Sequence, residues 1–136
     1  MNAAVPSSGA VVELDAAGFG ATIPGHAFAI IDFWAPWCGP CRGFAPVYAA
    51  AAARHPGILF AKVNTEVEQD LAAQFGIRSI PTLVIFRDDI IVYADAGALS
   101  PAALDEVIAA AEALDMDSVR RELAAQEAAT TGTGAA

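Results

Sequence analysis

The chain alternates between short apolar runs and longer segments in which apolar residues recur every three or four positions. Phe28–Trp34 is a nearly continuous apolar and aromatic run, typical of a central strand that is covered on both faces. The runs Val11–Leu14, Ile58–Val63, Thr82–Phe86 and Ile90–Ala94 predict further strands. The apolar pattern therefore predicts a sheet of about five strands.

Two helices are predicted in the central part of the chain. The first runs from about Gly39 to His55 and is stopped by the Pro-Gly dipeptide that follows it. Thr65 and Glu68 have the spacing of a capping box and predict the start of the second helix, which ends at Gly76. The residues expected on its buried face are Leu71, Ala72 and Phe75.

Helix signals also follow the last predicted strand. Ser100, a good N-cap residue, precedes Pro101 and begins a helix with apolar residues at i, i+3, i+4 and i+7. Residues 115–129 are expected to add an amphipathic helix, and residues 130–136, which are Thr, Gly and Ala only, a disordered tail. At the other end, residues 1–10 are expected to be a flexible lead, and the glycine-rich segment 16–25 gives only a weak helix signal.

The order of these elements defines the expected fold class. Strands and helices alternate until two strands follow each other through Arg87-Asp88-Asp89, which predicts a hairpin because Asp tolerates such turns. A length of 136 residues suits one domain, which we place at residues 11–114. The expected class is α/β, a central mixed sheet with helices on both faces.

Composition excludes several classes of function. The formal net charge of −9 argues against a nucleic-acid binder and against electrostatic attachment to anionic lipid. The longest charge-free stretch, residues 16–31, is interrupted by glycine and proline and is too short to span a bilayer. No basic residue precedes Arg42, so a secretory signal is not expected, and we predict a cytoplasmic protein.

The two cysteines of the chain, Cys38 and Cys41, stand where the central strand ends and a helix begins. The free N–H groups and the dipole of a helix N-terminus stabilise a thiolate, so the pKa of the Cys38 thiol should fall. Cys41 lies on the same helical face, close enough to form a disulfide with Cys38. The pattern therefore predicts Cys38 as the attacking thiol and Cys41 as the resolving thiol.

Other uses of a cysteine pair fit less well. A structural zinc site needs four ligands, and the two histidines, His26 and His55, are separated from the pair in sequence or along the helix. Covalent haem attachment needs a histidine where this chain has Arg42. An inert buried pair is the remaining alternative. Redox chemistry is favoured, and no metal is expected.

The nine residues from Phe33 to Cys41, FWAPWCGPC, resemble the active-site signature of the thioredoxin family. The similarity continues through Asp32, Pro46, Lys62, Ile80-Pro81-Thr82 and Gly97-Ala98, over roughly residues 12–113. The resemblance implies a thioredoxin fold and a thiol–disulfide oxidoreductase without a bound cofactor. It also implies that electrons come from NADPH through thioredoxin reductase, and that clients are disulfide-containing proteins such as peroxiredoxins, methionine sulfoxide reductases or ribonucleotide reductases.

Asp32 is an acidic residue within an apolar strand, and its burial should raise its pKa. The resemblance implies that it accepts and donates a proton for Cys41, through water. A structural ion pair with Lys62, the only lysine of the chain, is the alternative, and both can hold. The resemblance thus implies a catalytic group made of Cys38, Cys41, Asp32 and Lys62.

The same family pattern implies a flat apolar docking surface. Pro81 is expected to be cis and to lie beside the cysteine pair, so that the backbone of Ile80 meets an extended client segment. For Trp37, the alternative to a place on this surface is a packed position in the core. The residues expected to contact the client are Trp37, Gly39, Pro40, Ile80, Pro81, Gly97 and Ala98.

The sequence thus predicts a monomeric, general protein-disulfide reductase. The neutral Gly39-Pro40 pair favours a reductant, because oxidants and isomerases of this superfamily usually carry a histidine there. Two alternatives stay open: a dedicated electron donor to one client enzyme, and a binding module without redox turnover.

Overall fold

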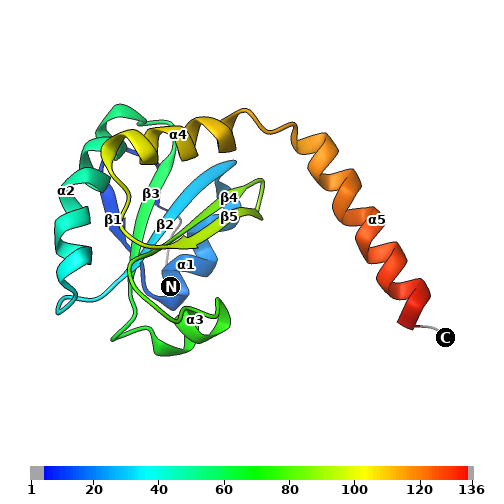
Figure 1. Cartoon of the computed structure of the whole chain (residues 1–136), viewed down its shortest axis with the longest axis horizontal. Coiled ribbons are helices and arrows are strands. Elements are labelled where there is room, and N and C mark those ends of the chain that lie inside the picture. Colours follow the sequence, from blue (N-terminus) through cyan, green and yellow to red (C-terminus); the bar gives the residue numbers. More distant parts are fainter. Residues whose placement is uncertain (1–4, 135–136) are drawn as a thin grey trace.

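A computed structural model of the chain describes residues 5–134 and contains one mixed sheet of five strands in the order β1-β3-β2-β4-β5 (Figure 1). β3 pairs in parallel with β1 and β2, whereas β4 is antiparallel to both β2 and β5. The strands are β1 (Val11–Glu13), β2 (Phe28–Trp34), β3 (Leu59–Asn64), β4 (Thr82–Arg87) and β5 (Ile90–Ala96). The expected five-stranded mixed sheet is confirmed.

Helices cover both faces of this sheet, as expected for the α/β class (Figure 1). The helices are α1 (Ala16–Thr22) with a short 3-10 turn (Ile23–Gly25), α2 (Gly39–Arg54), α3 (Gln69–Gln74), α4 (Pro101–Glu112) and α5 (Met116–Gly134). Helices α2 and α4 pack on one face and α1 and α3 on the other. The alternation along β2 explains this arrangement, since Ile30 joins one core cluster while Ile31 and Phe33 join the other.

Tyr48 connects helix α2 to the two central strands. Its hydroxyl group is buried and lies 2.9 Å from the carbonyl oxygen of Ile30 in β2 and 2.8 Å from that of Ala61 in β3. The two carbonyl oxygens share this one hydrogen-bond donor. The ring also packs against Phe44 and Phe60. This contact holds α2, and with it the cysteine pair at its start, against the sheet.

We expect Tyr48→Phe to lower the free energy of unfolding by about 1–2 kcal/mol, because the one buried hydroxyl donor that the two carbonyl groups share is lost. Urea denaturation monitored by circular dichroism measures this change. Tyr93→Phe, on the half-buried strand β5, is the matched control and should change stability by less than about 0.5 kcal/mol. Equal losses in the two variants would contradict the assignment.

Two local predictions were wrong. Thr65 and Glu68 do not form a capping box, because α3 begins later, at Gln69, and Glu68 is its N-cap residue without a side-chain cap. The Glu68 carboxylate instead accepts a hydrogen bond from the Ala16 N–H at the start of α1, at 2.9 Å. The weak segment 16–25 is helical, since Asp15 caps it by accepting from the Gly18 N–H at 2.6 Å.

The ends of two other elements follow their sequence signals. α3 ends in a Schellman motif, in which Gly76 has a positive φ of 64° and the N–H groups of Gly76 and Ile77 bond to Ala73 and Ala72. In the β4–β5 hairpin, Asp88 and Asp89 both adopt positive φ, of 52° and 65°. This is the backbone of a type I′ turn, formed here without glycine.

The additional C-terminal helix is present and leaves the domain (Figure 1). Its large apolar residues are Met116, Val119 and Leu123, of which Met116 is buried, Val119 is partly buried and Leu123 is exposed. The structure also differs from the expected disordered tail, because α5 continues through residues 130–134; residues 135–136 lie outside the described part. An existing helix extends at low cost, since each added residue gains a hydrogen bond without new nucleation.

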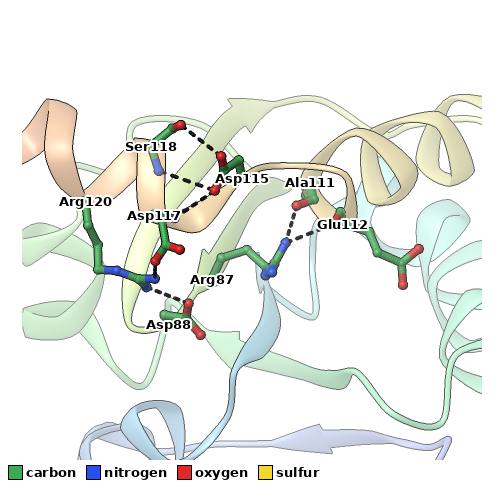
Figure 2. Close-up of polar contacts among 8 residues, drawn as sticks. All are labelled: Arg87, Asp88, Ala111, Glu112, Asp115, Asp117, Ser118 and Arg120. Atoms are coloured by element: carbon green, nitrogen blue, oxygen red, sulfur yellow. Dashed lines mark hydrogen bonds and ion pairs between the residues drawn. The ribbon is translucent and has the colours of Figure 1, made fainter.

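Polar contacts at the junction of α4 and α5 fix the start of α5 (Figure 2). Arg87 donates to the carbonyl groups of Ala111 and Glu112, the last turn of α4. The Asp115 carboxylate accepts hydrogen bonds from Ser118, which lower the pKa of this carboxyl. Arg120 donates to Asp88 in the β4–β5 turn at 2.9 Å and to Asp117.

At the other end of the chain, the expected flexible lead divides into residues 1–4, which lie outside the described part, and residues 5–10. These form neither helix nor strand. Val5 nevertheless packs against the core, its N–H donates to Thr22 Oγ1 at 3.3 Å, and its carbonyl oxygen lies 2.7 Å from His26 Nε2. His26 thus contacts the segment before β1 and helps to hold it against the domain.

Candidate active site

The cysteine pair lies at the N-terminus of α2, directly after the loop that follows β2. Cys38 is the N-cap residue, and its Sγ accepts a hydrogen bond from the Cys41 N–H at 3.2 Å. The two cysteines form a disulfide with a Cα–Cα distance of 5.2 Å. When this disulfide is reduced, the same N–H group and the helix dipole stabilise a thiolate at Cys38.

A cis peptide bond lies beside the disulfide. The bond between Ile80 and Pro81 is cis, as the family resemblance implies, and the Ile80 carbonyl oxygen is 3.7 Å from Cys38 Sγ. The Gly97 N–H, just after β5, donates to the Pro81 carbonyl at 2.8 Å. Three chain segments that are far apart in sequence therefore meet at the cysteines.

The surface around the disulfide is exposed and uncharged at most positions. Trp37 is 66% exposed, which rules out the alternative that it is a core residue. Gly39, Pro40, Gly97 and Ala98 are also exposed, while Ile80 is half-buried and Pro81 is buried. A groove of about 350 Å³ runs beside this surface and is lined by Trp37, Thr65, Gln69, Ile77, Arg78 and Ile80, among others. Cys38 and Cys41 are themselves buried, so the disulfide lies just beneath this surface.

Asp32 is buried in the middle of β2, in the strand that leads into the cysteine loop. Its side-chain atom Oδ1 has no hydrogen-bond partner. Burial raises the pKa of this carboxyl from 3.8 to about 7, the nearby charge of Lys62 opposes the rise, and Glu13 adds to it. Asp32 therefore exchanges a proton near neutral pH.

The ion pair between Asp32 and Lys62, an open alternative from the sequence, is not formed at contact distance. Lys62 Nζ instead lies 4.0 Å from Glu13 Oε1 and 4.5 Å from the centroid of the Trp34 ring. Trp34 Nε1 in turn donates to Glu13 Oε2 at 3.1 Å. An ammonium group is easier to keep at this solvent-exposed edge than beside a buried carboxylate, where it would lose its hydration.

Two residues near the site were not recognised from the sequence. Glu13 contacts both Lys62 and Trp34, and Thr65 ties the end of β3 to the end of β2 by donating from its N–H and its hydroxyl to the Trp34 carbonyl oxygen, at 2.8 and 3.1 Å. Glu13 could have been found only with the strand register in hand, because it pairs across strands that are far apart in the chain.

Two other features concern residues 5–134 alone. These residues contain no group of three or more His, Cys, Asp and Glu side chains placed to hold a metal ion. Among them there is also no helix that combines the length and the apolar character needed to cross a membrane.

A redox-active cysteine pair at a helix N-terminus, next to a cis-proline in this sheet topology, defines a thiol–disulfide oxidoreductase that reduces protein disulfides. The sequence model described as Thioredoxin matches residues 10–110. The chain belongs to the thioredoxin family.

Individual relatives agree with this assignment. A Streptomyces coelicolor protein named as a thioredoxin 2 is 51% identical over 117 residues, which covers 86% of this chain and 87% of the relative. Thioredoxin f of spinach chloroplast, in its long form, has a similar structure, with a TM-score of 0.73, 28% identity, and coverage of 83% of this chain and 100% of its own. A mutant thioredoxin of Halobacterium salinarum gives a TM-score of 0.71 at 28% identity, covering 76% and 92% of the two chains.

Proposed function

We propose that this protein is a monomeric, general reductant of disulfides in other proteins, working in the cytoplasm and recharged by an NADPH-dependent thioredoxin reductase. The observation that carries the proposal is the Cys38–Cys41 disulfide at the start of α2, 3.7 Å from the Ile80 carbonyl oxygen and next to an exposed, uncharged surface. The reaction transfers two electrons from the reduced pair to the client disulfide.

In the first step, the Cys38 thiolate attacks one sulfur of the client disulfide. A bond forms between Cys38 Sγ and that sulfur, and the other client sulfur leaves as a thiolate. In the second step, the Cys41 thiolate attacks Cys38 Sγ, re-forms the Cys38–Cys41 disulfide and releases the remaining client sulfur. The cysteine pair is oxidised and the client disulfide is reduced to two thiols.

Cys41 must lose its proton before it can attack, and Asp32 is the group that we assign to accept it, through water. Three observations support this role: the carboxyl is buried, Oδ1 has no partner in the protein, and its pKa of about 7 suits proton exchange near neutral pH. The proton then passes to one of the two client thiolates. The other takes a proton from solvent, equal to the one that Cys38 gave up when it became a thiolate, so protons balance over the cycle.

Client binding is assigned to the exposed surface around Trp37 and the groove beside it. The Ile80 backbone next to Cys38 offers main-chain hydrogen bonds to an extended client segment, which gives recognition with little dependence on sequence. Uncharged contacts at Gly39, Pro40, Gly97 and Ala98 fit the same purpose. This mode of recognition favours a general reductant over a donor dedicated to one client enzyme.

The recharging route is tested with insulin as the client. With NADPH and purified bacterial thioredoxin reductase, catalytic amounts of the protein should reduce the disulfides of insulin and consume one NADPH for each disulfide reduced. Dithiothreitol in place of NADPH and reductase is the control for intrinsic activity. Reduction with dithiothreitol but not with any reductase would contradict the recharging route, and failure with both would contradict the proposed function.

A further inference from the structure

Three charged residues lie side by side across three neighbouring strands. In the parallel pairing of the sheet, Lys62 of β3 is the register partner of Glu13 in β1 and also of Asp32 in β2. Side chains at paired positions of neighbouring strands point to the same face of a sheet. One ammonium group is therefore placed between two carboxyl groups, one at the sheet edge and one in the interior.

The ammonium group lies on the side of the edge carboxylate. Lys62 Nζ is 4.0 Å from Glu13 Oε1, and it also lies over the Trp34 ring, 4.5 Å from its centroid. The other Glu13 oxygen, Oε2, accepts the indole N–H of Trp34 at 3.1 Å. Each of these three side chains thus contacts the other two, and we call them the Glu13–Trp34–Lys62 cluster.

Among residues 5–134, the Asp32 carboxyl makes no ion pair and Oδ1 has no hydrogen-bond partner. The charged and titratable groups that face it are Lys62 from β3, Glu13 from β1, and Tyr48 and the cysteine pair from α2. The Tyr48 hydroxyl is directed to two backbone carbonyl groups, and the cysteines are joined in a disulfide. Lys62 is thus the one cation in this set, and its position decides how strongly the Asp32 carboxylate is stabilised.

We propose that Glu13 is a positioning residue, which holds the Lys62 ammonium at the sheet edge and thereby withholds it from Asp32. Asp32 then keeps its proton until near neutral pH, the range in which it has to take the proton of Cys41. The inference rests on the proposed role of Asp32 in proton transfer. Glu13 itself touches no reacting atom and acts through Lys62.

Glu13→Gln tests this inference with little change of shape, because the amide oxygen can still accept the Trp34 N–H while the negative charge is lost. The Asp32 carboxyl is followed by carbon-13 NMR across pH 4–9 in the oxidised and reduced protein. We expect its titration midpoint to fall by about one pH unit, since Lys62 is free to approach it. The pH profile for insulin reduction should move in the same direction.

The same substitution in a Lys62→Met background separates positioning from direct repulsion between the two carboxylates. If Glu13 acts by holding Lys62, the shift caused by Glu13→Gln should shrink to less than half in that background. An equal shift with and without Lys62 would overturn the inference, as would an unchanged Asp32 midpoint in the single variant.

Glu127→Gln, on the helix that leaves the domain, is the matched control for the loss of one negative charge and should leave the Asp32 titration unchanged. A shift in this variant equal to that of Glu13→Gln would also overturn the inference. The measurement is independent of turnover. An unchanged midpoint in Glu13→Gln, together with slow reduction by Asp32→Asn, would reject the role of Glu13 and leave the proposed function intact.

Discussion

Replacing Cys38 with serine is expected to reduce the rate of insulin-disulfide reduction at least about a thousandfold, to the uncatalysed background. The serine hydroxyl cannot form the mixed disulfide that starts the reaction. Cys41 is not expected to substitute, because Cys38 is the N-cap residue at which the helix start stabilises a thiolate, whereas Cys41 lies inside the first turn of α2. The assay follows insulin precipitation with dithiothreitol as the electron source. Activity that persists undiminished in this variant would reject Cys38 as the attacking thiol.

Cys41→Ser is the matched control, since it removes one sulfur from the same disulfide. This variant should still attack the client but fail to resolve the intermediate, so that a covalent complex accumulates on non-reducing gels. Mass spectrometry of the captured proteins then distinguishes a general reductant, with many partners, from a donor to one client. A complex trapped through Cys41 in Cys38→Ser, and none in Cys41→Ser, would reverse the assigned roles.

Asp32→Asn is expected to stabilise the folded protein at pH 8 by about 4 kcal/mol, because the carboxylate no longer has to be buried with its charge. The carboxyl has a pKa of 3.8 when exposed and about 7 in the fold, so the folded state binds its proton more tightly. In the wild type, the contribution of the Asp32 carboxyl to the free energy of unfolding is therefore complete below about pH 4 and is lost as the pH rises to about 7. The gain of the variant should be absent at pH 4 and complete above pH 7.

Urea denaturation at pH 4, 6 and 8 measures this difference. Asp105→Asn, which removes an exposed partner of Arg54, is the control and should change stability by less than about 1 kcal/mol at each pH. A gain for Asp32→Asn that does not depend on pH would contradict the linkage.

The same variant should reduce insulin at least about tenfold more slowly at pH 7 and 8, because Cys41 loses its proton acceptor.

Much of the fold follows from local signals in the sequence. The run Phe28–Trp34 is the central strand with the same bounds, because a strand covered on both faces needs apolar residues at every position. Ser100 caps α4 as its type and place before Pro101 predict, accepting from the Ala103 N–H at 3.1 Å. Local rules failed at Thr65, where the hydroxyl bonds to the Trp34 carbonyl of another strand in preference to the helix.

The spacing of the two cysteines and their place between a strand and a helix determined, by themselves, the disulfide at the N-terminus of α2. Only the tertiary structure decided the environment of Asp32. Which cation lies near it depends on the register of β1, β3 and β2, and these strands come together from segments far apart in the chain. A pKa depends on distance and burial in three dimensions. The position of the Lys62 ammonium relative to the carboxyl groups of Glu13 and Asp32 therefore cannot be predicted from the sequence.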